Sequence, residues 1–397
     1  TEGGELSSTE VPEVTLGLTA PDLSVNLLTG PTIPNISLMA NVVQGLVALD
    51  SAGELVPAIA SEWEQVNPTT YVYKLDPEQR FSNGDPVTAE DVVFSMRYAM
   101  DPKTGSVTSS FYLNVKSIDQ TGPDEVTVKL KTPDPTWDYV PGQYPGWIYE
   151  KDSLKAAGEN LGSPDGIPIG SGPYKITEFT ADRVVFERNE HYAGEQPPVA
   201  KFTVRLIDDD STRLAAMQSG DIDGALYVPL QSTRQWQELP DTELYSATTP
   251  NLDLIWFDTT KAPFDDPHVR RAVMYAFNRE AVVDNVLGGN ATVAMPQVLP
   301  DMWVNEMSVE EAEAREDEMG PLYEYDMEKA ADELAQSKYP DGFDATVYTT
   351  ASAPELALAM QGLQQSLSEL GINLTVREIS DVNYYDRASS GNFEMLS

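Results

Sequence analysis

Strand-type and helix-type segments alternate along the whole chain, and this alternation constrains the fold more than any other feature of the sequence. At residues 71–75, Tyr, Tyr and Leu alternate with Val and Lys, a period-two pattern that predicts a strand. A helix is then predicted to begin after Thr88, with Asp91 in capping-box position. Because the same succession continues without a fixed repeat, we expect a mixed α/β architecture.

The remaining segments follow the same two patterns. Further strands are predicted at residues 13–18, 125–131, 174–179, 183–188, 202–207, 253–257 and 373–379. Helices are predicted over residues 36–49, from a Ser211 cap to a stop at Gly220, from Pro267, from an Asp326 cap, and from Pro354 to residue 370.

The charge of the chain excludes several classes of partner. Asp and Glu number 64 against 25 Lys and Arg, which gives a formal net charge of −39. Such a chain repels phosphate backbones and anionic lipid headgroups, so we expect neither nucleic-acid binding nor electrostatic membrane binding. The excess of acid also favours solubility in concentrated salt. A salt-tolerant source and an ordinary acidic secreted protein both remain open.

Length and composition limit the number of domains and the chemistry that the chain can carry. With 397 residues the chain is long enough for two or three domains. It contains no cysteine, which removes disulfides and thiolate chemistry. No apolar run approaches the roughly 20 residues that a membrane helix needs. Residues 1–11 are rich in Gly, Ser, Thr and Glu, and we expect a flexible spacer there, either a lipoprotein linker or a frayed terminus.

The sequence offers little for catalysis or metal binding. His191 and His268 are the only histidines, and neither has a second histidine at helical or hairpin spacing. Asp221 to Gly224 lacks the spacing of a calcium loop. Gly170 to Gly172 lacks the lysine of a phosphate-binding loop, so we expect a tight backbone crossing there. We predict no catalytic residue, metal or cofactor, although abundant carboxylate pairs keep a secreted hydrolase as an alternative hypothesis.

Aromatic and amide side chains in loops near strand ends are the remaining candidates for a site. Each of them fits a hydrophobic core, and together they fit a cleft that holds a ligand by stacking and hydrogen bonds. They are Phe111, Tyr112, Tyr144, Trp147, Tyr227, Asn251 and Trp256.

Five ordered motifs carry a resemblance to a known family. They comprise residues 71–75 with 81–95 (FSNGDPVTAEDVVFS), 170–174 (GSGPY) with 187–192, 213–223 (RLAAMQSGDID), 261–273, and 325–343. Spread from about residue 40 to the C-terminus, they resemble the family-5 extracytoplasmic solute-binding proteins of ABC transporters. That family includes dipeptide-, oligopeptide- and nickel-binding proteins.

The resemblance implies a bilobal fold of the class II periplasmic-binding-protein type. Lobe I is expected from residues 12–48 and 167–249, an inserted subdomain from 49–166, and lobe II from 250–397. Two hinge segments would join the lobes, and the ligand would lie in the cleft between them. The family pattern continues beyond Ser397, so we expect lobe II to be incomplete here. In peptide-binding relatives the continuation carries the aspartate that pairs with the ligand's α-amine.

The resemblance also places ligand contacts on this sequence. Relatives use the loop that matches residues 29–34, the segment near 108–112, the position just after the 221–223 motif, and the strand at 251–256. The residues carried over are Thr32, Ile33, Thr108, Tyr227, Asn251 and Trp256. At residues 226–228, Leu-Tyr-Val replaces the amide-rich stretch of oligopeptide binders, which favours short peptides or sugars over long peptides.

We therefore expect a solute-binding protein that is not an enzyme. It would capture a small solute, with a short peptide favoured, and deliver it to the permease of an ABC importer. The expected location is extracytoplasmic, with membrane contact only through an N-terminal lipid anchor, and the expected state is a monomer. An oligosaccharide, nickel or opine ligand, and a sensory or adhesive surface module, remain alternatives.

Overall fold

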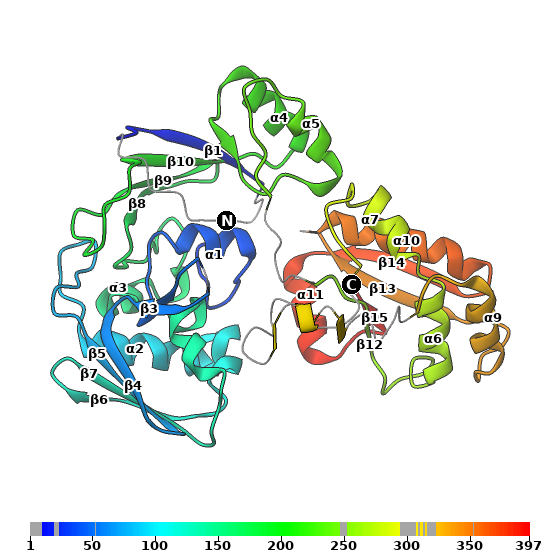
Figure 1. Cartoon of the computed structure of the whole chain (residues 1–397), viewed down its shortest axis with the longest axis horizontal. Helices are drawn as coiled ribbons and strands as arrows, with labels where there is room; N and C mark the ends of the chain where they lie inside the picture. Colours follow the sequence, from blue (N-terminus) through cyan, green and yellow to red (C-terminus); the bar gives the residue numbers. More distant parts are fainter. Residues whose placement is uncertain are drawn as a thin grey trace. The chain divides into compact units, whose positions relative to one another are not determined.

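The computed structural model describes residues 10–19, 24–51, 53–246, 252–293, 307–308, 310–312, 314–315, 323–351 and 353–397. The chain forms two compact units, Thr1–Tyr227 (unit 1) and Val228–Ser397 (unit 2), as Figure 1 shows. Each unit buries a hydrophobic core of its own.

Residues 228–249, expected in lobe I, fall in unit 2 in this division. The lobe boundaries therefore remain a prediction, and most of the 1–11 spacer lies outside the described residues.

The first sheet of unit 1 joins parallel and antiparallel strands. Its five strands are, in spatial order, β11 (Gly224–Ala225), β1 (Val14–Leu18), β10 (Lys201–Leu206), β9 (Arg183–Arg188) and β8 (Tyr174–Phe179). Strands β10 and β11 both run parallel to β1, while β9 is antiparallel to both of its neighbours, β10 and β8. The carboxyl ends of β1, β10 and β11 therefore share one edge of the sheet, where open α/β sheets bind ligands.

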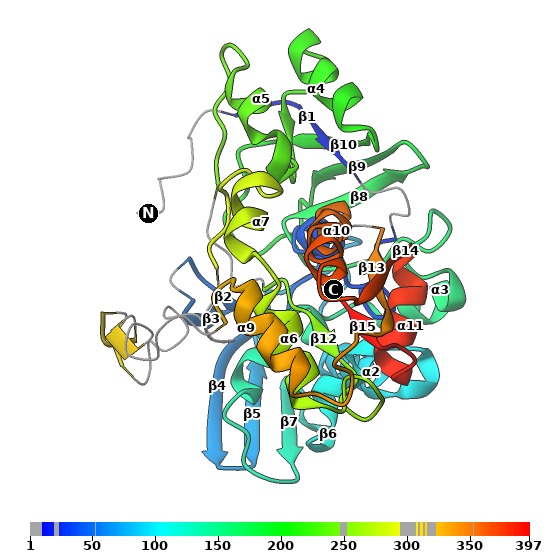
Figure 2. The same ribbon diagram turned by 90° about the vertical axis from the view of Figure 1, so that its right-hand side faces the viewer.

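The second sheet of unit 1 is antiparallel and has one buried face. Its order is β4 (Ala60–Asn67), β5 (Thr70–Leu75), β7 (Glu125–Leu130) and β6 (Val115–Gly122), and its strands are labelled near the bottom of Figure 2. Tyr71, Tyr73 and Leu75 are all buried, as the alternation predicts.

Unit 1 also contains the two-stranded sheet of β2 (Val47–Leu49) and β3 (Leu55–Pro57), and helices α1 (Ile33–Met39), α2 (Ala89–Met100), α3 (Lys151–Ala157) and α4 (Asp210–Ser219).

Unit 2 is built on one mixed sheet. The strand order is β12 (Trp256–Phe257), β15 (Met395–Leu396), β13 (Asp344–Thr350) and β14 (Asn373–Ile379), with β13 parallel to both of its neighbours. Its helices are α5 (Thr233–Gln237), α6 (Pro267–Tyr275), α7 (Arg279–Asn285), α9 (Met327–Ala335), α10 (Pro354–Ser368) and α11 (Asp381–Ser390). Apolar residues of α6, α9 and α10 fill its core. Both units thus confirm the α/β class.

The start of α2 confirms the predicted capping box. The Thr88 hydroxyl accepts a hydrogen bond from the Asp91 backbone N–H at 3.3 Å, and the Asp91 carboxylate accepts one from the Thr88 N–H at 3.0 Å. The predicted cap at Asp326 is also confirmed, since its carboxylate accepts from the Lys329 N–H at 2.9 Å. These local signals depend on residues within a single turn.

Replacing Thr88 with alanine is expected to lower the free energy of unfolding by about 1 kcal/mol, because the Asp91 N–H loses its acceptor. Thr88→Ser retains the hydroxyl and is the matched control. Urea unfolding of the complete protein measures the difference, and equal stability of the two variants would contradict the expectation.

Three local predictions are wrong, and tertiary contacts explain the first. The helix predicted over 36–49 ends at Met39, and residues 47–49 form β2. Between them Gly45 packs so closely that a Cβ atom would lie 2.0 Å from the Pro141 carbonyl oxygen. The Leu46 N–H also donates to that oxygen at 3.0 Å. Because Pro141, about a hundred residues away along the chain, makes these contacts, residues 45–49 do not continue the helix.

The other two errors concern element ends. Helix α4 is capped by Asp209 and not by Ser211, because the Asp209 carboxylate accepts from the Thr212 N–H at 2.7 Å. The strand predicted at 253–257 contains only Trp256 and Phe257. The helix start differs because several competent side chains compete for its orphan N–H groups.

The backbone crossing predicted at residues 170–172 is confirmed. A Cβ atom on Gly170 would lie 2.2 Å from the Val42 carbonyl oxygen, and one on Gly172 would lie 2.7 Å from the Asn41 oxygen. The Gly172 and Tyr174 N–H groups donate to the same two carbonyl oxygens at 2.9 Å each. Only glycine permits this approach.

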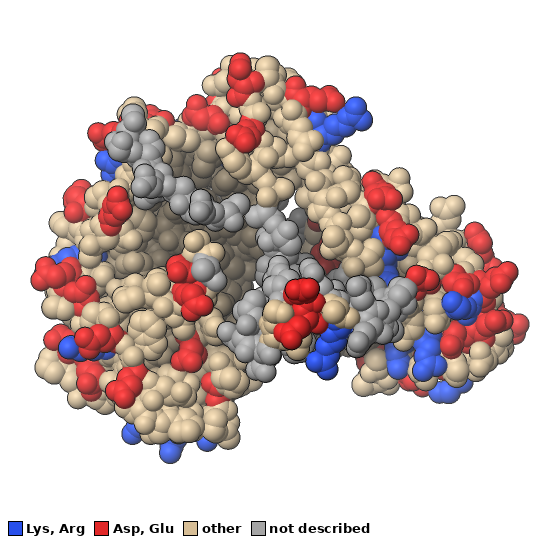
Figure 3. Space-filling model, viewed as in Figure 1, with Lys and Arg blue, Asp and Glu red and all other residues tan. Residues whose placement is uncertain are grey.

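Among the charged side chains on the face shown in Figure 3, Asp and Glu are more frequent than Lys and Arg. This distribution matches the excess of 64 acidic over 25 basic residues. None of the helices in the described part of the chain combines the length and apolar character that a membrane crossing needs.

Candidate ligand-binding site

In unit 1, two of the predicted contact segments meet at α1, and a third is bonded to the loop that precedes this helix. Thr32 is the N-cap of this helix and accepts from the Asn35 N–H at 3.4 Å, and Ile33 follows with 49% of its surface exposed. In the preceding loop, the Leu28 carbonyl accepts from the Val107 N–H at 2.8 Å, which holds the 107–112 segment beside it.

Tyr227 reaches the same helix from the end of β11. Its hydroxyl forms a short hydrogen bond with the Ser37 hydroxyl on α1. The ring is 47% exposed, and the backbone is left-handed with φ of 53°. A non-glycine residue in this conformation carries a strain of about 1–2 kcal/mol. The exposed ring is therefore held by contacts with its surroundings and is not placed by backbone preference.

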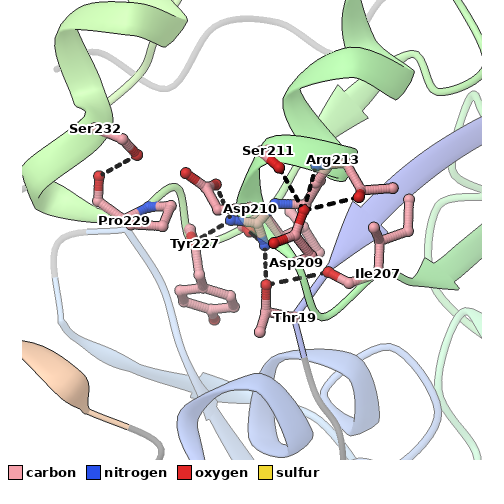
Figure 4. Close-up of polar contacts among 11 residues, drawn as sticks. Thr19, Ile207, Asp209, Asp210, Ser211, Arg213, Tyr227, Pro229 and Ser232 are labelled. Carbon is pink, nitrogen blue, oxygen red and sulfur yellow. Dashed lines mark hydrogen bonds and ion pairs between the residues drawn. The ribbon is translucent and has the colours of Figure 1, made fainter.

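A buried ionic group lies at the carboxyl edge of the parallel strands (Figure 4). The Arg213 side chain in α4 is fully buried, and its guanidinium donates to Asp210 at 3.1 Å and to the Thr19 hydroxyl at 2.6 Å. The Thr19 hydroxyl donates in turn to the Ile207 carbonyl at 3.3 Å. Hydrogen bonds from Ser211 and Thr212 lower the pKa of the neighbouring Asp209 carboxyl.

The 107–112 segment exposes apolar side chains. Thr108 itself is fully buried, and its hydroxyl bonds to the Ser106 hydroxyl at 2.7 Å and donates to the Ala99 carbonyl at 3.4 Å. Val107 and Phe111 are 51% and 44% exposed, and the Phe111 ring meets the Tyr144 ring edge-on at 5.9 Å. Within this segment Val107 and Phe111 are thus better placed than Thr108 to meet a ligand.

The two remaining predicted contacts belong to unit 2. Trp256 lies in β12, pairs with Leu396 in antiparallel register and is 56% exposed. Asn251 lies outside the described residues. Among the other aromatic candidates, Tyr112 is a core residue whose hydroxyl donates to the Pro145 carbonyl at 2.6 Å. Tyr144 and Trp147 are partly buried and pack against the unit 1 core.

The histidines have structural surroundings. The His268 Nδ1 atom lies 2.6 Å from the Glu333 carboxylate, which links α6 to α9. The His191 Nε2 atom lies 3.8 Å from Glu190, on the surface. Within the described ranges, no three His, Asp or Glu side chains gather in a way that could hold a metal ion.

Sequence reasoning missed Arg213 and Ser37 as parts of this site. Arg213 belongs to the 213–223 motif and lies four residues after the capping Asp209. In a chain with only 25 Lys and Arg residues, this position could have drawn attention to it. Ser37 carried no signal, because its partner Tyr227 is 190 residues away.

The fold of the chain indicates the general class of protein to which it belongs. The chain has the fold of the bilobal periplasmic binding proteins. It is similar to the periplasmic binding protein DppA of Helicobacter pylori, solved in complex with the peptide STSA, with a TM-score of 0.81 and 24% identity over 98% of this chain and 78% of that one.

The chain belongs to the bacterial extracellular solute-binding proteins, family 5, whose middle region matches residues 54–397. It is 28% identical over 338 residues to the glutathione-binding protein GsiB of Escherichia coli K12, covering 84% of this chain and 63% of GsiB. It is 25% identical over 366 residues to heme-binding protein A of Haemophilus influenzae, covering 85% of this chain and 64% of that protein. The chain thus spans less than two thirds of the length of these relatives.

Proposed function

We propose that this chain is the ligand-capturing part of an extracytoplasmic solute-binding protein, and that it delivers a short peptide to the permease of an ABC importer. It is proposed to bind without catalysis. Membership in the extracellular solute-binding family supports the class of function. The finer statements, namely an N-terminal lipid anchor, a monomeric state and the lobe boundaries given above, belong to the same proposal.

One observation supports a particular surface of unit 1 as the place where the ligand binds. Although they come from distant parts of the sequence, Ile33 begins α1, the Tyr227 hydroxyl bonds to Ser37 on that helix, and the Val107 N–H bonds to Leu28 in the loop that precedes it. They expose aromatic and aliphatic side chains next to hydroxyl groups. Such a surface suits a ligand with an apolar side chain and a hydrogen-bonding backbone, which is the chemistry of a short peptide.

Within unit 1 we assign direct ligand contact to Ile33, Val107, Phe111 and Tyr227. Trp256 remains a proposed contact on the strength of the resemblance. Thr32 would contribute through the capped start of α1. Thr108 would contribute only by fixing its segment, since its hydroxyl is enclosed. Asn251 remains a proposed contact on the strength of the resemblance alone.

Titration calorimetry of the complete protein tests the ligand class. The panel comprises the tetrapeptide Ser-Thr-Ser-Ala, glutathione, a neutral disaccharide and nickel with histidine. Binding of the peptides alone is the expected result. Saturable binding of the disaccharide or the nickel complex, without peptide binding, would replace the peptide by that solute. Turnover of a peptide or glycoside would contradict the assignment as a binding protein.

Replacing Tyr227 with alanine is expected to weaken binding of the tetrapeptide by about fivefold or more, since truncating a central aromatic contact costs about 1–3 kcal/mol. Tyr245→Ala is the matched control, because Tyr245 is 82% exposed and hydrogen-bonded to Glu243. Trp256→Ala is expected to have an effect similar to that of Tyr227→Ala. Unchanged affinity in both variants would remove these aromatic side chains from the site.

A further inference from the structure

The guanidinium of Arg213 contacts the backbone on both sides of the Tyr227 Cα atom. Besides Asp210 and Thr19, it donates to the carbonyl oxygens of Leu226 and Tyr227, each at 3.4 Å. Figure 4 shows the Arg213 side chain directed toward this turn. One buried side chain thus connects the start of α4, the residue after β1 and the residues after β11.

The two carbonyl contacts depend on a turn in the backbone at Tyr227. In an extended strand, successive carbonyl groups point to opposite sides. The left-handed conformation of Tyr227, with φ of 53°, turns the carbonyls before and after it toward the same side. The hydrogen bonds from Arg213 therefore form together in this turn and would not do so in an extended strand.

The same conformation decides where the Tyr227 side chain points. The Cα–Cβ direction is fixed by the backbone, and the hydroxyl at the far end of the ring bonds to Ser37 on α1. The ring is thus held at its backbone by Arg213 and at its hydroxyl by α1, with 47% of the residue exposed. A side chain that is held at both ends is preorganised for binding, because little of its conformational freedom remains to be lost when a ligand binds.

We propose that Arg213 is a positioning residue of the ligand site, which holds Tyr227 in its left-handed turn so that the ring presents one fixed face. The assignment of a ligand to that ring rests on the proposed function, whereas the positioning itself does not. Lysine cannot replace Arg213 in this role, because its single ammonium group lacks the fork of donors that reaches several acceptors at once.

A fluorine NMR experiment measures the position of the ring without any ligand. The complete protein is labelled with 3-fluorotyrosine, and the Tyr227 resonance is assigned by its loss in Tyr227→Phe. In Arg213→Lys this resonance is expected to shift toward the value of free 3-fluorotyrosine. Arg188→Lys is the matched control in unit 1, because Arg188 also donates to two backbone carbonyls, those of Pro198 and Val199. An unmoved Tyr227 resonance in Arg213→Lys would overturn the proposal.

A double-mutant cycle tests the same coupling through stability. Glycine adopts left-handed backbone without the Cβ penalty, so a Tyr227→Gly background has no strain to release when the turn relaxes. The Arg213→Lys substitution is therefore expected to reduce the folding equilibrium constant about fivefold more in a Tyr227→Gly background than in the native protein, where relaxation of the turn recovers part of the loss. Additive effects would show that Arg213 stabilises unit 1 without acting on the turn.

A milder variant covers the case in which Arg213→Lys does not fold. Thr19→Val removes only the hydroxyl that accepts from Arg213 at 2.6 Å. It is expected to move the Tyr227 resonance in the same direction and by less, and an unmoved resonance again counts against the proposal.

Binding of the tetrapeptide Ser-Thr-Ser-Ala separates this inference from the proposed function. Weaker binding in both Arg213→Lys and Tyr227→Ala is expected. If the resonance shifts in Arg213→Lys but neither variant changes the affinity, Arg213 positions Tyr227 and the ligand contact at Tyr227 is wrong. If Tyr227→Ala alone loses affinity and the resonance does not move, the contact stands and the positioning role is wrong.

Discussion

Replacing Gly342 with alanine is expected to destabilise unit 2 by about 3–5 kcal/mol, through left-handed strain together with steric overlap. Gly342 has φ of 90°, and a Cβ atom there would lie 2.1 Å from the Gly371 carbonyl oxygen and 2.4 Å from its carbonyl carbon. The two glycines precede β13 and β14, and the Asn373 N–H donates to the Phe343 carbonyl at 2.8 Å. Because the overlapping atoms belong to the backbone, relief requires the starts of the two parallel strands to separate.

Calorimetry of the complete protein measures this effect as a fall in Tm of about 10 °C for a unit of this size. Gly362→Ala is the matched control in the same unit. Gly362 lies inside α10, and a Cβ atom there meets nothing within 4 Å. Alanine should stabilise this helix by about 0.5–1 kcal/mol. A Gly342→Ala variant as stable as Gly362→Ala would show that the two strand starts are not held in this arrangement.

Replacing Trp137 with alanine is expected to cost about 3–5 kcal/mol in unit 1. Trp137 is 1% exposed, its indole N–H donates to the Tyr73 hydroxyl at 3.2 Å, and its ring lies 6.5 Å from the Tyr71 ring and 6.0 Å from the Tyr112 ring. Burial raises the pKa of the Tyr73 hydroxyl, so this group stays protonated. The substitution leaves both a large cavity and a buried hydroxyl without its donor.

Two variants in the same 3₁₀ helix, Trp137–Gly142, separate these causes. Trp137→Phe keeps a six-membered ring in the core and loses the five-membered part of the indole with its N–H donor, so its cost should be smaller, about 1–3 kcal/mol. Tyr139→Ala should cost little, because Tyr139 is 38% exposed. Urea unfolding followed by circular dichroism provides the free energies, and a Trp137→Ala cost close to that of Tyr139→Ala would place Trp137 outside the core.

The sequence alone determined the features that depend on neighbours along the chain. The alternation at residues 71–75 sets which side chains of β5 are buried, and Thr88 with Asp91 sets the start of α2. The same kind of local evidence, extended over five ordered motifs, was enough to indicate the family. Periodicity and capping act within a few residues, so they can be recognised without knowing the fold.

Only the tertiary structure decided how distant segments constrain one another. The Pro141 carbonyl keeps residues 45–49 out of a helix that their spacing favours, and Thr108 is enclosed although it lies in a predicted contact segment. Tyr227 meets Ser37 across 190 positions, and Arg213 holds its turn from another element. Such contacts depend on which chain segments fold beside each other. The free energy of close packing and of buried hydrogen bonds then outweighs local propensity, and no pattern in the sequence records that choice.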